Sequence, residues 1–155
     1  MKSEIFTESL EKLKSYCAYQ ERCEFEVNKK LESLGINETG ILAVISKLKQ
    51  QNYLDNGRFA EAFASGKHKI KGWGKVKIRV ALKAKRLPEE LISKALEQLD
   101  QEVYSARLSE VAQKKWRLLG DKKDRNTRQN LFRFLYGKGY ESELVNHIIS
   151  DLWES

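Results

Sequence analysis

The stretch that decides the fold is residues 74–99, GKVKIRVALKAKRLPEELISKALEQL. Apolar side chains recur at i and i+4 before a short break next to Pro88, and at i, i+3, i+4 and i+7 after it. This spacing is typical of helices that bury one face. The apolar positions are Ile78, Leu82, Leu87, Ile92, Ala95, Leu96 and Leu99. The stretch therefore predicts two helices joined by a short turn.

The same apolar pattern occurs twice more in the chain. Moving 51 residues towards the N-terminus, the positions are Val27, Leu31, Ile36, Ile41, Val44, Ile45 and Leu48. Moving 53 residues towards the C-terminus, they are Leu131, Leu135, Tyr140, Val145, Ile148, Ile149 and Leu152. Every position stays apolar, which indicates an internal repeat of about 50 residues.

A third helical pattern precedes each of these pairs. Its apolar residues are Leu10, Leu13 and Cys17, then Phe59, Ala60 and Phe63, then Leu108, Val111 and Ala112. The turns carry Asn37, Pro88 and Gly139, which are residues that start or stop helices. We therefore predict an all-α fold of three tandem three-helix repeats, at 1–54, 55–103 and 104–155, in an elongated, curved array. Units this small bury marginal cores, so we expect neighbours either to share packing or to lie in an extended, slightly flexible row.

The composition limits the class of protein. The chain has 155 residues, of which 41% are hydrophobic and 33% charged, and it has one proline. This excludes a large two-domain enzyme and disfavours a many-stranded β fold. No stretch is apolar enough to span a membrane, and the N-terminus lacks an apolar signal core. We expect a soluble, cytoplasmic monomer.

The sequence lacks the constellations that catalysis and metal binding need. Cys17 and Cys23 are too few and too far apart for a zinc site, and His68 and His147 have no histidine at ligand spacing. Capping explains Asp55 more simply than metal binding does. We predict no catalytic residue, no cofactor and no metal.

The charge is concentrated in the second and third repeats. The predicted units carry net charges of 0, +4 and +3, and residues 67–86 contain nine cationic side chains and no acidic one. The nine are Lys67, Lys69, Lys71, Lys75, Lys77, Arg79, Lys83, Lys85 and Arg86. Such a segment favours a polyanion or an acidic protein surface as partner, although a merely solvated face is the simpler alternative.

Four of these cations are predicted to form one stripe on a helix that starts near Gly74. They are Lys75, Arg79, Lys83 and Arg86. Like charges at this spacing cost roughly 0.2 to 0.5 kcal/mol per pair, and the basic segment itself contains no acidic residue to offset that cost. We predict that this stripe makes the main contact, followed by residues 67–71, with Arg125 and Arg128 of the third unit as further candidates. The role of Trp73, inside the basic segment, stays open.

Two segments resemble the bacterial RecX family, which regulates the RecA recombinase. Residues 53–60, Tyr53-Leu54-Asp55-Asn56-Gly57-Arg58-Phe59-Ala60, resemble the family's Tyr-Leu-Asp-Asp-x-Arg-Phe-Ala segment. Residues 74–85, GKVKIRVALKAK, resemble its Gly-x-x-Arg-Ile-x-x-Glu-Leu-x-x-Lys-Gly stretch. The departures are Asn56 for aspartate, Lys77 for arginine, Ala81 for glutamate and Arg86 for glycine. The resemblance extends over nearly the whole chain.

The resemblance implies tandem three-helix repeats and a non-enzymatic modulator in recombination and DNA repair. Such a protein binds along the groove of the RecA filament, contacts protein and DNA, and lowers ATP hydrolysis and strand exchange. A direct DNA-binding module of helix-turn-helix-like units remains the alternative, and a purely structural helical adaptor is a third. Within the motif, we expect Asp55 or Asn56 to cap a helix and Phe59 to enter the core. Arg58 either has a structural role or contacts the partner.

Overall fold

The computed structural model describes residues 2–155, which form nine helices and no strand. They are α1 (Lys2–Tyr19), α2 (Glu24–Ser33), α3 (Glu38–Gln50), α4 (Asn56–Lys71), α5 (Lys75–Ala84), α6 (Glu89–Glu97), α7 (Gln101–Leu118), α8 (Arg125–Gly137) and α9 (Ser142–Glu154). The all-α prediction is confirmed. Within this described range, no helix combines the length and the apolarity that crossing a membrane requires.

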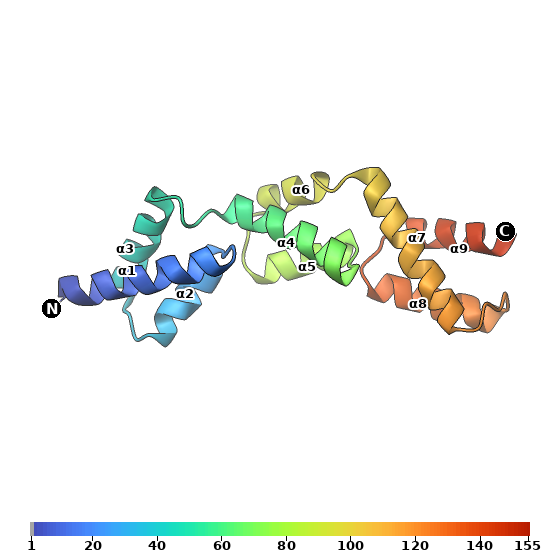
Figure 1. Ribbon diagram of the computed structural model, residues 1–155, viewed down its shortest axis with the longest axis horizontal. Helices are drawn as coiled ribbons and strands as arrows, with labels where there is room; N and C mark the ends of the chain where they lie inside the picture. The colour runs from blue at the N-terminus through green and yellow to red at the C-terminus, as the bar shows by residue number, and fades with distance from the viewer. Residues whose placement is uncertain (1) are drawn as a thin grey trace.

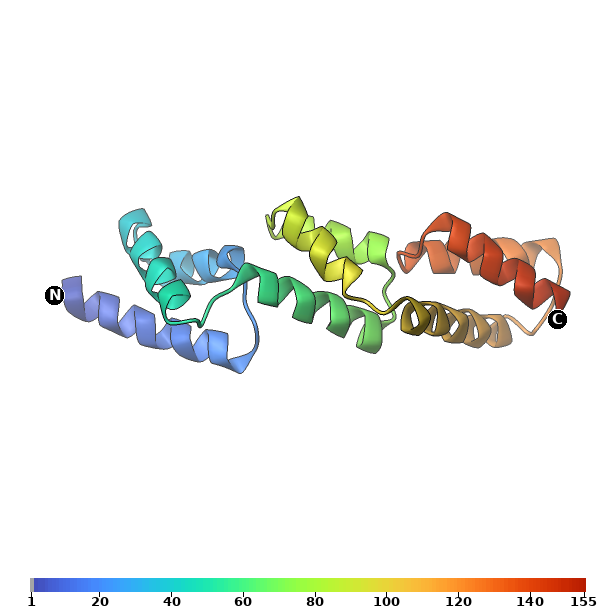
Figure 2. The same cartoon turned by 90° about the horizontal axis from the view of Figure 1, so that it is seen from above.

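The helices are arranged in three groups of three, which lie in a row along the long axis of the molecule (Figures 1 and 2). We call α1–α3 unit 1, α4–α6 unit 2 and α7–α9 unit 3. Unit 1 lies at one end of the row and unit 3 at the other. The boundaries at 54/55 and 103/104 and the curvature stay proposals, and α7 already begins at Gln101.

Each unit encloses its own hydrophobic core, because its helices turn their apolar faces towards one another. All 21 repeat positions lie in these cores or pack against them. Side chains that are fully enclosed include Leu31 in unit 1, Ile78 in unit 2 and Leu131 in unit 3. The helical spacing alone therefore identified the buried faces correctly.

Neighbouring units share packing, which is one of the two arrangements expected from the sequence. Cys23 precedes α2 of unit 1, yet it is buried in the core of unit 2, and Phe25 packs against the same core. Both cysteines are free and buried, and burial raises the pKa of each thiol. Units 1 and 2 therefore share core side chains where they meet.

Helix starts follow the expected capping chemistry. The side chain of Asn37 accepts a hydrogen bond from the Gly40 N–H at the start of α3, and Asp55 accepts one from the Arg58 N–H at the start of α4. Asp100 and Asp124 cap α7 and α8 in the same way. These caps fix where each helix begins, and so which residues face outward.

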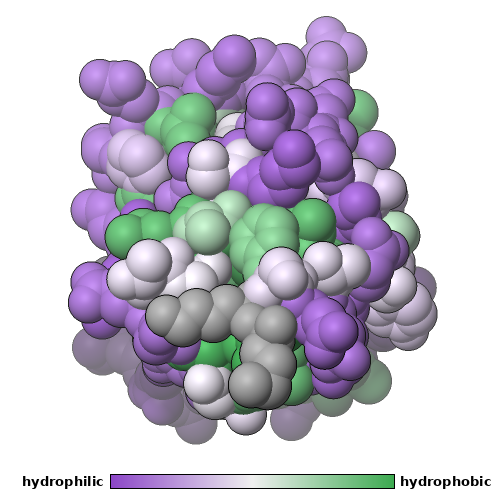
Figure 3. All heavy atoms as spheres, turned by 90° about the vertical axis from the view of Figure 1, so that its left-hand side faces the viewer, coloured by the Kyte–Doolittle hydropathy of each residue, from purple (hydrophilic) through white to green (hydrophobic). Residues whose placement is uncertain are grey.

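The free end of unit 1 presents a mixed surface. Viewed from that end, hydrophobic side chains gather in a band between hydrophilic ones (Figure 3). A shallow cavity there is lined by Ile5, Phe6 and Ile36, and Ile5 is among the exposed apolar side chains.

Candidate polyanion-binding surface

The junction between units 2 and 3 brings cationic side chains of both units together. Backbone groups bond directly across it: the Gly74 N–H donates to the Lys138 carbonyl at 2.8 Å, and the Val76 N–H donates to the Gly139 carbonyl at 2.9 Å. The Tyr140 hydroxyl, fully buried, donates to the Gly72 carbonyl at 2.9 Å. Buried backbone bonds of this kind fix the two units in one orientation.

A polar aromatic cluster reinforces this junction. The His68 ring stacks on Tyr104 with 4.9 Å between centroids, and its Nδ1 lies 2.9 Å from the Trp73 carbonyl. The Tyr104 hydroxyl accepts from the Lys75 N–H and donates to the Glu141 carboxylate. Burial, followed by the hydrogen bond to Glu141, strongly raises the pKa of Tyr104. His68 is therefore a packed part of the junction, and not one more member of a basic surface.

Next to this junction lies a groove of about 640 Å³ that we call the cationic groove. Its six cations come from α4, from α7 and from the residue that follows α8, and Glu110 is its one acidic lining residue. They are Lys71, Arg107, Lys114, Lys115, Arg117 and Lys138. Residues that are far apart in the sequence thus form one surface of strongly positive charge.

The electrostatics of Lys138 reflect this crowding. Partial burial lowers the pKa of its ammonium group, and the charges of Lys77, Arg107, Lys71 and Lys114 lower it further. Its Nζ donates to the Lys71 carbonyl at 3.0 Å, so it is held where the like charges gather. A bound polyanion would relieve this repulsion, which makes the groove the best candidate contact surface in the described chain.

The basic segment of residues 67–86 is divided among several environments. Lys67 and Lys77 both lie over the half-buried Trp73 ring, at 4.9 and 4.6 Å from its centroid. Lys75 lies 4.8 Å from the centre of the Tyr104 ring. Lys69 and Lys71 are exposed at the end of α4. Trp73 is thus a packed support for two lysines.

The predicted unopposed stripe is wrong in two respects. Glu89, at the start of α6, pairs with Arg79 and lies 3.7 Å from Lys83, so an acidic group does offset their charge. Arg86 follows α5 with φ of 60° and lies over the Phe25 ring of unit 1, off the stripe. Lys85 also pairs with an acid, the Glu26 carboxylate, at 3.0 Å. Whether these residues contact a partner stays a prediction.

The two candidates in unit 3 lie on α8, outside the cationic groove. Arg125 is exposed in the first turn. Arg128 donates to the Ser150 hydroxyl at 3.3 Å and lies 5.8 Å from the centre of the Trp153 ring. They do not join the cations of unit 2 in one surface.

The motif at residues 53–59 links unit 1 to unit 2. Tyr53 and Leu54 pack in the core of unit 1, whereas Phe59 is buried in the core of unit 2. Arg58 pairs with Glu21 of unit 1 and donates to the Asn52 carbonyl at 3.2 Å. Asp55 is the cap of α4, as expected. The structural interpretation of the motif accounts for all of these contacts.

Sequence reasoning missed Arg107, and it did not place Lys114 and Lys138 of unit 3 on one surface with Lys71 of unit 2. No motif relates them to Lys71, because their proximity depends on how unit 3 is turned against unit 2. Within the described range, no group of three or more histidine, cysteine or acidic side chains forms a metal site.

Comparison with known families and proteins gives one consistent result. The family model "RecX, second three-helix domain" matches residues 55–96, and "RecX, third three-helix domain" matches residues 102–149. A "Regulatory protein RecX" of Clostridium perfringens (strain 13 / Type A) is 32% identical over 133 residues, covering 84% of this chain and 62% of that protein. One of Chlorobium phaeobacteroides (strain BS1) is 30% identical over 131 residues and is covered to 83% of its length. The chain thus spans about three fifths of the clostridial relative.

Solved structures show the same fold. A crystal structure of regulatory protein RecX superposes with a TM-score of 0.84 at 25% identity, over 97% of this chain and 73% of that one. The RecX structure from Lactobacillus salivarius gives 0.85 at 23% identity, over 97% of both chains. The tandem three-helix architecture is therefore shared with these proteins.

Proposed function

The chain belongs to the RecX family, and on that premise we propose that it is a non-enzymatic regulator of the RecA recombinase. It binds along the RecA filament on DNA as a monomer and lowers ATP hydrolysis and strand exchange. The cationic groove lies against the nucleic acid of the filament. In this role the protein limits recombination during DNA repair.

The observation that carries this proposal is the cationic groove on a row of three units. Six cations face one space with a single carboxylate among them, and the junction beneath them is joined by backbone hydrogen bonds. A phosphate backbone would be stabilised there without reorganisation of the surface. The elongated shape allows contact with successive subunits of a long filament (Figure 1).

The test is the single-stranded-DNA-dependent ATPase of the host RecA, titrated with this protein. The K71E/K114E variant reverses two exposed cations of the groove, and K12E/K94E makes the same change in charge at sites outside it. We expect the wild type and K12E/K94E to inhibit at substoichiometric concentrations and K71E/K114E to inhibit at least tenfold less. Equal inhibition by all three would refute the role of the groove.

Direct DNA binding is the second candidate, since the same cations suit a bare duplex. Its affinity would fall with salt at a log-log slope of about −0.9 for each phosphate neutralised. If the protein instead docks on the filament, part of its binding affinity should resist salt, and that part should require RecA. Absence of any effect on RecA, together with tight and salt-sensitive DNA binding, would favour the direct DNA binder.

A further inference from the structure

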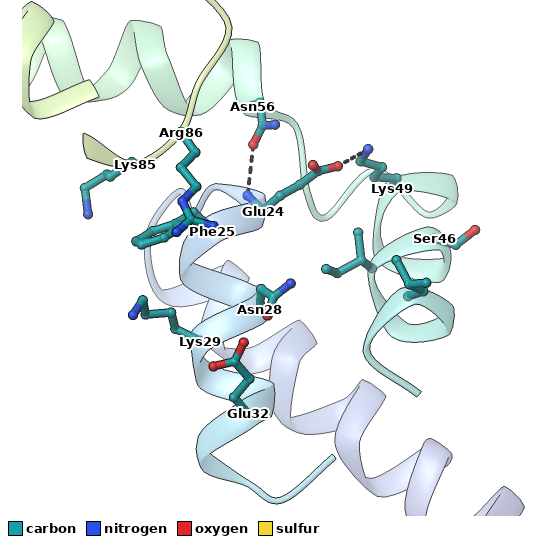
Figure 4. Close-up of a pocket in the computed structure, with 12 residues that line it drawn as sticks. Glu24, Phe25, Asn28, Lys29, Glu32, Ser46, Lys49, Asn56, Lys85 and Arg86 are labelled. Atoms are coloured by element: carbon teal, nitrogen blue, oxygen red, sulfur yellow. Dashed lines mark hydrogen bonds and ion pairs between the residues drawn. The ribbon is translucent and has the colours of Figure 1, made fainter. Parts of the chain in front are cut away.

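A second concave surface lies where unit 1 meets unit 2, and no cationic-groove residue lines it. This α2–α3 pocket has a volume of about 780 Å³. Its walls come from α2 and α3, and the turn after α5 closes one side with Lys85 and Arg86 (Figure 4). Asn56 of unit 2 also reaches it, where its side chain accepts a hydrogen bond from the Glu24 N–H at 2.9 Å.

One wall of the pocket is aromatic and cationic. The Arg86 guanidinium lies 5.3 Å from the centre of the Phe25 ring, and the Lys29 ammonium lies 5.2 Å from it. The other two cations of the pocket already have carboxylates: Lys49 pairs with Glu24, and Lys85 pairs with Glu26. Among the ion pairs of residues 2–155, none includes Lys29 or Arg86. These two cations are therefore available to an incoming acidic group.

The backbone of Arg86 has a conformation that is uncommon for an arginine. The residue adopts φ of 60° just after α5, a left-handed conformation that glycine adopts without strain. Compared with glycine, the arginine at this position is strained, but it places a guanidinium group over the pocket. Strained positions of this kind are enriched at ligand sites.

The opposite wall is apolar. Leu42 of α3 is 63% exposed, and Ile45 lies half-buried on the next turn of the same helix. Together with the Phe25 ring, these side chains leave apolar surface in contact with water, which a second apolar side chain would cover.

The mixture of groups identifies the class of partner. Glu24 and Glu32 also line the pocket, and its apolar wall of Leu42 and Ile45 offers no contact to the charged phosphates of a nucleic-acid backbone. A protein segment satisfies both walls at once, with a large apolar side chain between Phe25 and Leu42 and carboxylates on Lys29 and Arg86. We infer that the α2–α3 pocket docks such an acidic, apolar-anchored segment of a partner protein. The inference rests on the proposed function, which makes that partner RecA itself.

The experiment uses the full chain and RecA filaments assembled on single-stranded DNA. L42E and K29E change the two walls of the pocket, and V80E and K30E place a glutamate at an exposed apolar residue and at an exposed lysine outside it. We expect both pocket variants to require about tenfold more protein for half-maximal ATPase inhibition, which is the scale of a central interface residue. Their anisotropy titrations on a bare labelled oligonucleotide should match the wild type, as should both assays for V80E and K30E.

Three outcomes count against the inference in different ways. If the wild type inhibits RecA and both pocket variants inhibit equally well, the pocket is not the docking site and the proposed function stands. A parallel loss of bare-DNA binding in L42E and K29E would identify a nucleic-acid surface instead. A wild type that neither binds the filament nor alters its ATPase refutes the proposed function, and with it the assignment of RecA as partner.

Discussion

Gly74 and Gly139 lie backbone against backbone across the junction of units 2 and 3. A Cβ atom at Gly74 would lie 2.4 Å from the carbonyl group of Gly139, and one at Gly139 would lie 2.3 Å from the Cβ of Lys77. Only residues without a side chain allow the hydrogen bonds from Gly74 and Val76 to form here. The orientation of unit 3, and with it the cationic groove, depends on this contact.

We therefore expect G74A to separate units 2 and 3 locally and to destabilise the protein by about 1 to 3 kcal/mol, which is typical of overpacking. Gly74 has φ of −84°, so an alanine there is not strained by its own backbone and the effect isolates the steric contact. Chemical denaturation measures the loss. The matched control is G66A, since a Cβ added at that helical glycine would meet nothing within 4 Å; equal stabilities for the two variants would contradict the argument.

Tyr140 makes the same junction sensitive to alkaline pH. Burial raises the pKa of its hydroxyl to about 12, from an ordinary value of 10.0. The folded state thus holds this proton more tightly than the unfolded state, so its contribution to stability is complete below pH 10 and is lost as the pH rises towards 12. Melting temperatures should fall across this alkaline range, and Y140F should weaken that dependence while lowering stability at neutral pH, because the Gly72 carbonyl loses its donor.

Asn56 belongs to unit 2, and we predict that it stabilises the start of α2 in unit 1. Its side chain accepts the hydrogen bond of the Glu24 N–H, at the first residue of α2. N56A removes this acceptor and should cost about 1 kcal/mol, as the loss of a helix cap does. N56D keeps an acceptor oxygen and should cost less, so urea titrations that rank N56D below N56A in stability would contradict the prediction.

Arg79 and Lys71 should contribute unequally to polyanion binding. The Arg79 guanidinium pairs with Glu89, whereas Lys71 has no carboxylate partner among the ion pairs of the described residues. K71A should lower the salt slope of oligonucleotide binding by about 1, and R79A by clearly less. Anisotropy titrations at several salt concentrations measure both slopes. If K71A and R79A lower the salt slope equally, the prediction is wrong.

Much of the fold is predictable because helical periodicity is local information. Apolar spacing identified positions such as Val27, Ile78 and Leu131, and each is fully buried. The cap at Asn37 was likewise predictable from its residue type at a helix start. The predicted cationic stripe was only partly right, since Glu89 reaches Arg79 from another helix and Arg86 leaves the helix altogether.

The sequence by itself determined the helices, their buried faces, the threefold repeat and the concentration of positive charge in its second and third units. Each follows from residue type and spacing within about 50 residues. Only the tertiary structure decided which cations keep their charge unopposed and which are paired, because that depends on contacts between helices and units. Arg107 and Lys138 join Lys71 in one groove through the glycine contact at the junction, and Arg86 reaches Phe25 across the other. Coulomb and desolvation energies depend on distances in space, and sequence spacing does not define these between separate helices.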